Sequence, residues 1–361
     1  MLKKNKKIKL LFLLLLILIV IVSFMIKPNK KNDHSSIFEI YKKVKVSQIF
    51  GLNIYQNNLY AASTFHNRIV KLDLDGNYLN FMNYFGNFEK PFQNNDDIKI
   101  FKKYNKIVGK MTNVHSIDFD RNGNMYISQY VTNKGGLNRG FTFVPKKCHG
   151  NCNEKDLITF KGFKGVSHSL FDIKRDNLLV SDYGDGEEKE GDIFIFNLND
   201  LKNKKKLSLI SNHKFKKPHI IRHDNINYYV VDMANKEIII MDKNFKILKK
   251  INNDFLEKKN NLKNIFKTIV SITFSDKFIF VSDVGTHSIF AFDYEWNLKF
   301  KIQEDRYTYY NNKITNLTKS ISESKINFKL HSPYDIFYNE DKLYIANTHN
   351  DELIILNFNK N

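Results

Sequence analysis

Residues 50–74 read FGLNIYQNNLYAASTFHNRIVKLDL, and this stretch decides the fold. It contains a short apolar and aromatic run, a polar turn, a second run that ends in small residues, and a third run. Runs of this length, separated by turn residues, are typical of short antiparallel strands. The stretch therefore predicts a three-stranded meander.

The pattern recurs along the chain, with a second run that ends in a small or acidic residue and with turns rich in Asp, Asn and Gly. Six copies occupy residues 50–74, 114–144, 167–197, 218–241, 270–292 and 333–357. Repeated short strands at this spacing indicate an all-β repeat protein, because each unit buries its apolar faces against its neighbours. No sustained helical periodicity follows residue 31.

The first copy carries a more specific signature. Residues 59–63 (LYAAS) lead to residues 66–70 (HNRIV) and then to Asp73-Leu74-Asp75-Gly76. This order is similar to that of NHL-repeat β-propellers, and weaker versions recur at residues 281–289 and 345–349. The resemblance covers about residues 44–361 and implies a six-bladed β-propeller.

Closure of the ring can also be predicted. The last repeat supplies three strand-like runs, whereas a propeller blade has four strands. Residues 37–46 (IFEIYKKVKV) are β-like but precede the first repeat. We expect them to pair with residues 353–358, to complete the last blade and to remove its open edge.

Three segments depart from the bare repeat: residues 87–111, 133–165 and 304–330. We interpret them as insertions. Loops of this length often carry function, although a solvated excursion explains each of them equally well.

The N-terminus predicts the compartment. Residues 10–26 form an apolar run broken only by Ser23, long enough to cross a bilayer, and no small-residue cleavage motif follows it. We predict a cytoplasmic basic segment at 1–9, an uncleaved transmembrane signal anchor at 10–26, a tether at 27–36 and a propeller at 37–361. Five lysines before the run keep the N-terminus cytoplasmic, which places the propeller in the periplasm or the extracellular space. A cleaved signal peptide is the alternative.

Charge and composition exclude several classes of protein. The chain has 361 residues, is 42% hydrophobic and contains two cysteines, which excludes both disorder and a small disulfide-framework domain. Eight lysines in residues 1–31, with no acid among them, leave +11 of the formal +19 for the remainder. This surplus of positive charge would attract anionic lipid headgroups or acidic polysaccharide, and ordinary solvation of the surface explains it equally well. Nucleic acid is not expected as a partner at this location.

One column of aligned residues suggests a metal-binding site. Aligned repeats place equivalent residues at the start of each innermost strand: Phe50, His115, His168, His219, Val270 and Tyr334. Neutral imidazoles are ligands for Zn²⁺ or a similar divalent metal, and three of them leave a position open for water or substrate. Histidines that only form hydrogen bonds inside a channel are the alternative.

In outline the chain also resembles the peptidyl-hydroxyglycine α-amidating lyases, which are six-bladed propellers with a three-His zinc at the axis, assisted by Tyr and Arg. His115, His168 and His219 match the ligand type, but they come from adjacent blades. Tyr130, Tyr183 and Arg222 are expected on the same face, without assigned roles.

Other sites are less favoured. The column contains no acid, which argues against a calcium-dependent propeller hydrolase, and residues 182–192 do not fit the EF-hand spacing. Cys148 and Cys152 predict a local disulfide outside the cytoplasm, with a Cys₂His metal site as a minor alternative.

The absence of a complete catalytic motif favours a membrane-anchored module that binds a protein, a polysaccharide or a small molecule at the channel mouth. A metal-dependent lyase or hydrolase built on His115, His168 and His219 is the second hypothesis.

Overall fold

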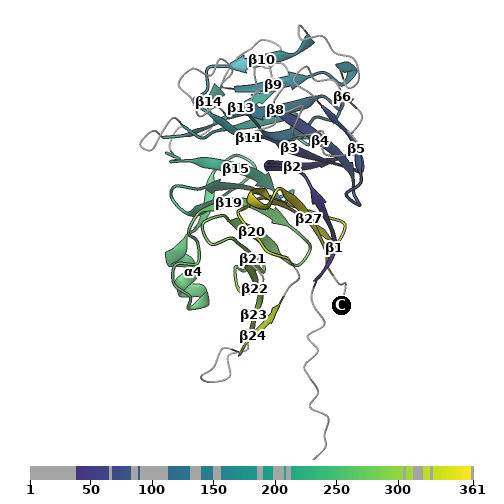
Figure 1. Cartoon of the computed structure of the whole chain (residues 1–361). Helices are drawn as coiled ribbons and strands as arrows, with labels where there is room; N and C mark the ends of the chain where they lie inside the picture. The colour runs from purple at the N-terminus through teal and green to yellow at the C-terminus, as the bar shows by residue number, and fades with distance from the viewer. Residues whose placement is uncertain are drawn as a thin grey trace, which may run out of the picture. The chain divides into compact units, whose positions relative to one another are not determined.

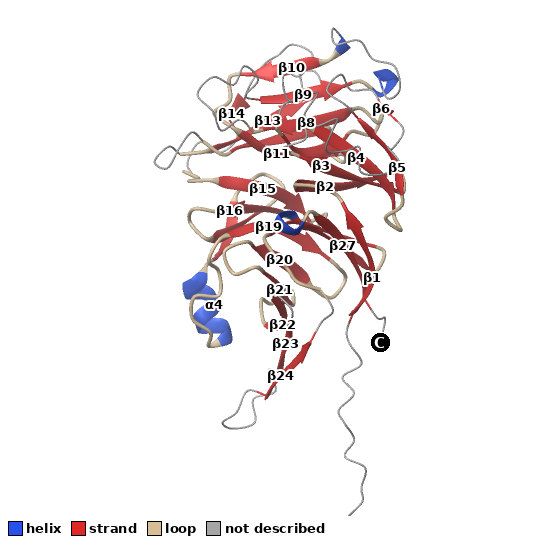
Figure 2. Cartoon of the chain, viewed as in Figure 1, coloured by secondary structure: helices blue, strands red, loops and turns tan. Residues whose placement is uncertain are grey.

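Strands dominate the computed structural model (Figures 1 and 2). It describes residues 38–64, 67–82, 88–89, 113–130, 140–148, 156–184, 190–197, 207–208, 213–303, 306–311, 320–325 and 328–358. The chain divides into two units. The first comprises Met1–Glu39 and Asn359–Asn361, of which only Phe38 and Glu39 are described. The second, Ile40–Phe358, is the propeller.

Six sheets form six blades; the strands of blades 1 to 5 follow one another in sequence, and blade 6 adds β1 to the last three strands of the chain. Blade 1 contains β2 (Ile49–Tyr55), β3 (Asn58–Ser63), β4 (Arg68–Asp73), β5 (Tyr78–Met82) and β6 (Phe88–Glu89). Blade 2 contains β7 (Val114–Phe119), β8 (Met125–Gln129), β9 (Gly140–Val144) and β10 (Ile158–Lys161). Blade 3 contains β11 (Val166–Asp172), β12 (Asn177–Asp182), β13 (Asp192–Asn197) and β14 (Leu207–Ser208).

The second half of the ring follows the same plan. Blade 4 contains β15 (Pro218–His223), β16 (Tyr228–Asp232), β17 (Glu237–Met241) and β18 (Ile247–Ile251). Blade 5 contains β19 (Ile269–Phe274), β20 (Ile279–Asp283), β21 (Ser288–Phe292), β22 (Leu298–Gln303), β23 (Arg306–Asn311) and β24 (Ser320–Lys325). Blade 6 contains β25 (Pro333–Asn339), β26 (Lys342–Asn347), β27 (Glu352–Phe358) and β1 (Phe38–Lys45).

Ring closure is confirmed. The strand order of blade 6 is β1-β27-β26-β25, so the strand that precedes the first repeat forms the outer edge of the last blade (Figure 1). The backbone N–H of Val46 donates to the carbonyl of Asp351 over 3.1 Å just beyond this pair. Val44 and Val46 are buried in the core between blades 6 and 1. The closing strand therefore contributes apolar contacts as well as backbone hydrogen bonds.

The acidic residue that ends the second strand of several repeats has a structural role. Asp232 accepts hydrogen bonds from the backbone N–H groups of Lys216 and Lys217 over 2.9 and 2.8 Å. Asp182 and Asp283 bind the equivalent segments of blades 3 and 5. Each carboxylate thus satisfies the backbone of the segment that leads into its innermost strand, which fixes where that strand begins.

Each of the expected insertions contains strands that belong to a blade. Residues 133–165 contain β9 and β10, the two outer strands of blade 2, so this segment is not solely an insertion. Residues 304–330 contain β23 and β24, a hairpin that extends blade 5 to six strands. Residues 87–111 contribute β6, and residues 90–111 lie outside the described part.

One helix was not expected. Helix α4 (Asn253–Asn260) follows β18 at the edge of the fold (Figure 2). The Asn252 side chain caps its start by accepting from the Phe255 N–H, and Asn261, in the left-handed region, ends it. Among its apolar residues only Leu256 is fully buried, so the helix carries no periodic apolar stripe that sequence reading could detect.

The predicted anchor at 10–26 and its flanking segments lie outside the described residues. Within the described part of the chain, no helix has both the length and the apolar character that a membrane span requires.

Candidate functional site

The innermost strand of every blade contains an irregularity at the same step, where residues of the first strand have no partner on the second. One residue is skipped in blades 1 to 5, and Tyr334 and Asp335 lie between the paired residues Pro333 and Ile336 in blade 6. The skipped residues in blades 1 to 5 are Phe50, His115, Ser167, His219 and Val270. A bulged residue is redirected relative to its strand, and here the bulges turn equivalent side chains toward one end of the channel.

This register corrects the predicted column in blade 3. Val166 pairs with Asp182 and His168 pairs with Ser181, so the bulged position is Ser167 and not His168. A shift of one residue reverses the direction of a strand side chain. His168 is 3% exposed, and its buried Nδ1 has no hydrogen-bond partner among the described residues. Burial and the nearby Arg222 charge lower the pKa of His168 well below its ordinary value.

Five of the six bulge residues line a cavity of ≈ 130 Å³, which we call the narrow mouth. Its lining comprises Phe50, Thr64, Asn113, His115, Tyr130, Ser167, Tyr183, His219 and Tyr334. The structure thus brings His115 and His219 together, with ring centroids 5.3 Å apart, and leaves His168 outside the lining.

Backbone carbonyls fix the tautomer of both imidazoles. Nδ1 of His115 lies 2.7 Å from the Ser167 carbonyl oxygen, and Nδ1 of His219 lies 2.8 Å from that of Val270. A carbonyl can only accept, so each Nδ1 carries the hydrogen and each Nε2 keeps its lone pair. Nε2 of His219 lies 3.3 Å from the Tyr334 hydroxyl. Burial lowers the pKa of His115 to about 3 and that of His219 to about 4, so both are neutral near pH 7.

One feature of the narrow mouth agrees with a metal site, and other features disagree with it. An imidazole whose Nδ1–H donates to a carbonyl is oriented as metal ligands usually are, although the Nε2 of His219 already lies within 3.3 Å of the Tyr334 hydroxyl. However, the described residues include no group of three or more His, Cys, Asp or Glu placed to hold a metal ion. Ser167 occupies the place in the ring where a third imidazole was predicted.

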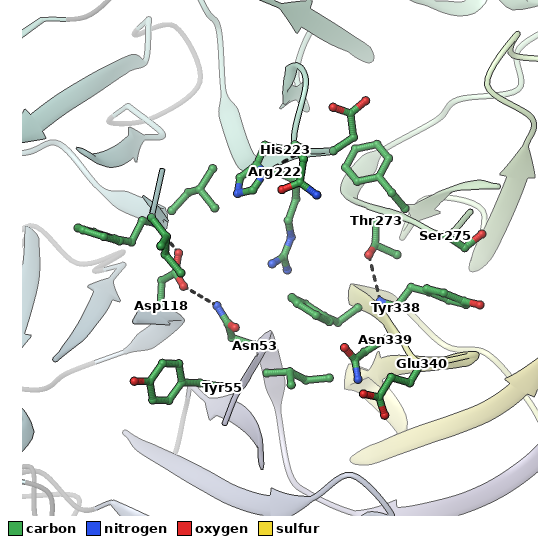
Figure 3. Close-up of a pocket in the computed structure, with 18 of the residues that line it drawn as sticks. Asn53, Tyr55, Asp118, Arg222, His223, Thr273, Ser275, Tyr338, Asn339 and Glu340 are labelled. Carbon is green, nitrogen blue, oxygen red and sulfur yellow. Dashed lines mark hydrogen bonds between the residues drawn. The ribbon is translucent and has the colours of Figure 1, made fainter. Parts of the chain in front are cut away.

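A larger cavity of ≈ 570 Å³, the wide mouth, lies at the opposite ends of the innermost strands (Figure 3). Its inner lining comes from positions three and four residues beyond each bulge residue. The first of these positions are Asn53, Asp118, Leu170, Arg222, Thr273 and Phe337. Tyr55, Phe274, Tyr294 and Tyr338 add aromatic residues to this lining, whereas Phe119 and Phe171, which also belong to it, are buried in the cores between blades.

Arg222 points into the centre of the wide mouth (Figure 3). Its Nη2 lies 3.2 Å from both carboxylate oxygens of Asp335, and its side chain is 8% exposed. Its guanidinium carbon lies 4.8 Å from the ring centroid of Phe337, over the ring. The buried Nε has no partner among the described residues. A buried donor without a partner costs free energy.

Asp118 belongs to the same lining as Arg222. Its carboxylate accepts from the Asn53 amide over 2.8 Å and from the backbone N–H groups of Phe119 and Phe171. Burial nevertheless raises its pKa to about 6. Burial also raises the pKa of Asp335, and the Arg222 charge opposes that shift. The wide mouth therefore combines buried polar and charged side chains with aromatic residues.

The remaining candidates are placed as follows. Tyr130 and Tyr183 line the narrow mouth with the histidines, as expected, whereas Arg222 faces the wide mouth and not the same face. Cys148, buried after β9, is disulfide-bonded, and Cys152 lies outside the described residues. Residues 185–189 of the acidic loop also lie outside the described part.

Sequence reasoning missed the wide mouth. The signal was available, because a step of three residues from the first column reaches Asn53, Asp118, Arg222 and Thr273. Four polar side chains in one column of innermost strands would have marked a second site.

Comparisons with known proteins close the description. No protein-family model matches the sequence, and no curated protein matches it. An auxiliary nutrient binding protein from Bacteroides thetaiotaomicron is similar with a TM-score of 0.55 at 12% identity, over 86% of this chain and 69% of that one. A catalytically inactive virginiamycin B lyase from Staphylococcus aureus, solved with quinupristin, gives 0.53 at 11% identity, over 89% and 99%. A streptogramin B lyase gives 0.51 at 11% identity, over 89% and 97%. Likeness at this identity establishes the fold alone, and it confirms a six-bladed β-propeller.

Proposed function

We propose that this chain is a membrane-anchored binding module, NHL-like in its repeats, that holds a small polar ligand in the wide mouth. The observation that carries the proposal is the ≈ 570 Å³ cavity into whose centre the Arg222 guanidinium points. Ligand sites are usually concave, within about 300–1,000 Å³, and combine apolar walls with a few fixed polar groups. The similarity to propellers named as auxiliary nutrient binding proteins supports the same function.

The lining narrows the ligand class. Arg222 can donate to an oxygen, while the carboxylates of Asp224, Asp276 and Glu340 belong to the same lining and disfavour anions. The aromatic residues of the lining offer flat apolar faces to a ring or a chain. A neutral or zwitterionic ligand with several oxygens fits these features best.

The location is part of the proposal. Residues 10–26 would anchor the chain, residues 27–36 would connect the anchor to the propeller, and the wide mouth would open into the periplasm or the extracellular space. The apolar run and the lysines before it support this orientation. A fixed position at the membrane surface would suit capture of a solute or presentation to a partner.

Ligand-dependent thermal stabilisation of the full chain in detergent tests the proposal. The panel contains mono- and oligosaccharides, amino acids and short peptides. Asp276→Trp partly fills the wide mouth from an exposed position, and Lys258→Trp, exposed on α4, is the matched control. We expect a panel member to stabilise the wild type and Lys258→Trp but not Asp276→Trp. Equal stabilisation of all three proteins, or of none, would contradict the proposal.

A metal-dependent lyase or hydrolase is the second candidate, because His115 and His219 do share a cavity with their Nε2 lone pairs unprotonated. It needs a further ligand in place of Ser167. Elemental analysis of the full chain beside a His115→Ala/His219→Ala variant tests it. Stoichiometric metal that disappears in a folded variant would favour this candidate over the binding module.

A further inference from the structure

Six aromatic rings form a closed cycle at the narrow mouth. In order around the cycle these are Phe50, His115, Tyr130, Tyr183, His219 and Tyr334. Neighbouring centroids in this order are 5.5, 5.7, 5.5, 5.9, 5.2 and 4.3 Å apart. A contact of 5.3 Å between His115 and His219 divides the cycle and leaves a four-membered part with Tyr130 and Tyr183.

In that four-membered part, the planes of neighbouring rings are steeply inclined to one another. Successive ring planes are inclined at 56°, 87°, 78° and 73°, and all four rings line the ≈ 130 Å³ cavity. A cation between neighbouring rings whose centroids are this close lies within the ~6 Å range of a cation–π contact with both. The cavity is much smaller than the roughly 300 Å³ of a drug-sized site, so it suits one compact group.

The lining carries no formal charge. It contains no Lys, Arg, Asp or Glu, and both histidines are held neutral by burial. Burial also keeps the hydroxyls of Tyr183 and Tyr334 protonated, since it raises the pKa of each. A hydrated metal ion would find few hard ligands here, whereas an alkylated cation loses little hydration and gains contact with several π-faces.

A buried carboxylate supplies a favourable field. Asp232 is 0% exposed and is held by the backbone N–H groups of Lys216 and Lys217 and by the Asn235 amide. After burial and Tyr130, its charge is one of the causes that raise the pKa of Tyr183. The Lys217 ammonium already lies over the Tyr183 ring, 5.3 Å from its centroid, so this ring attracts cations in the protein itself.

We propose that the narrow mouth is an aromatic cage that binds a methylated ammonium group, with Tyr130, Tyr183, His115 and His219 as its walls. The shared chemistry is a compact cation bearing methyl groups, whether free in solution or at the end of a larger molecule. This site is separate from the wide mouth, and its ligand does not depend on the function proposed there.

Choline is the probe, and 3,3-dimethylbutan-1-ol is its uncharged counterpart of the same shape. Both are titrated into the full chain by calorimetry in a maltoside detergent, because a choline-headed detergent would compete. We expect saturable choline binding at one site and at least tenfold weaker binding of the alcohol. Equal binding of the two compounds, or no choline binding by folded protein, would overturn the proposal.

Substitutions in the proposed cage test where choline binds. Tyr183→Leu and Tyr130→Leu remove one π-face each and should weaken choline binding at least threefold, whereas Tyr183→Phe keeps the face and should retain it. Tyr41→Leu, exposed on β1 and part of neither mouth, is the matched control. Lys217→Met removes the nearby ammonium and should tighten choline binding. Choline affinity that is unchanged in both leucine variants, with folding verified by circular dichroism, would refute the cage.

Choline-containing vesicles separate the two sources of the ligand. Phosphatidylcholine vesicles are compared with phosphatidylglycerol vesicles as competitors of free choline. Competition by phosphatidylcholine alone would identify a lipid headgroup, and competition by neither would identify a soluble ligand of the same cage. Equal competition by both vesicles would contradict recognition of the methylated cation.

Discussion

Removal of Arg222 should destabilise the propeller through the charge that it leaves behind. In Arg222→Met, Asp335 loses its only described cationic partner and remains 1% exposed. Loss of one member of a buried pair costs about 3–5 kcal/mol. Asp335 keeps hydrogen bonds from the Leu52 and Ile336 N–H groups, at 2.7 and 2.8 Å, and from the Ser271 hydroxyl. We therefore expect the lower end of the range, about 3 kcal/mol.

Urea denaturation provides the assay. Trp296 is the single tryptophan and is 2% exposed, so its fluorescence reports unfolding. Arg222→Met/Asp335→Asn removes the stranded charge and should regain at least half of the lost free energy of unfolding. A loss below about 1 kcal/mol in the single variant, or no recovery in the double variant, would refute the argument that a buried carboxylate dominates the cost.

Three further predictions follow from other parts of the chain. The folded-state pKa of Asp118, about 6, lies above its ordinary value near 4, so the native state binds the extra proton and stability falls as pH rises through this window, by roughly 3 kcal/mol. Urea midpoints at pH 4 and pH 7 should show a smaller fall in Asp118→Asn than in the wild type, because Asp335, whose pKa burial also raises, remains in the variant; equal falls would assign the effect to another group. Val44→Asp places a charge in the core between the closing strand and blade 1 and should cost about 2–4 kcal/mol, whereas Lys43→Asp at an exposed position should cost little; equal costs would deny β1 a role in closure. Alkaline phosphatase fused after residue 361 should be active outside the cytoplasm and a C-terminal fluorescent protein should not; a cytoplasmic C-terminus would overturn the predicted location.

The ring of blades could be predicted because its cause is local and repeated. Each copy carries its own strands and turns, and in blades 3 to 5 an acidic residue that binds the backbone leading into the innermost strand, as Asp232 does. The closing strand was predictable because the last repeat has three runs and an unpaired edge is unfavourable. These features need no knowledge of distant contacts.

The site was only partly predictable, because it depends on register. His168 and Ser167 are neighbours in sequence, and only the pairing of β11 with β12 decides which of them is bulged. That single step separates a three-His cluster from a pair of histidines within an aromatic cycle. The hairpin β23–β24 and helix α4 escaped detection for a related reason, since their sequences are mostly polar and lack a clear period.

The pairing of Arg222 with Asp335 was invisible in the sequence. The two residues are 113 positions apart and belong to blades 4 and 6, and they meet only because both blades face one axis. No local pattern encodes such a contact.

The most direct test of the central claim is hydrogen exchange of the full chain with and without the panel compound that stabilises it most. A ligand in the wide mouth should slow exchange in peptides that contain Arg222, Thr273 and Phe337, and it should leave peptides that contain Tyr130 and Tyr183 unchanged. Protection confined to the narrow mouth, or spread evenly over all six blades, would contradict the assignment of the wide mouth as the binding site.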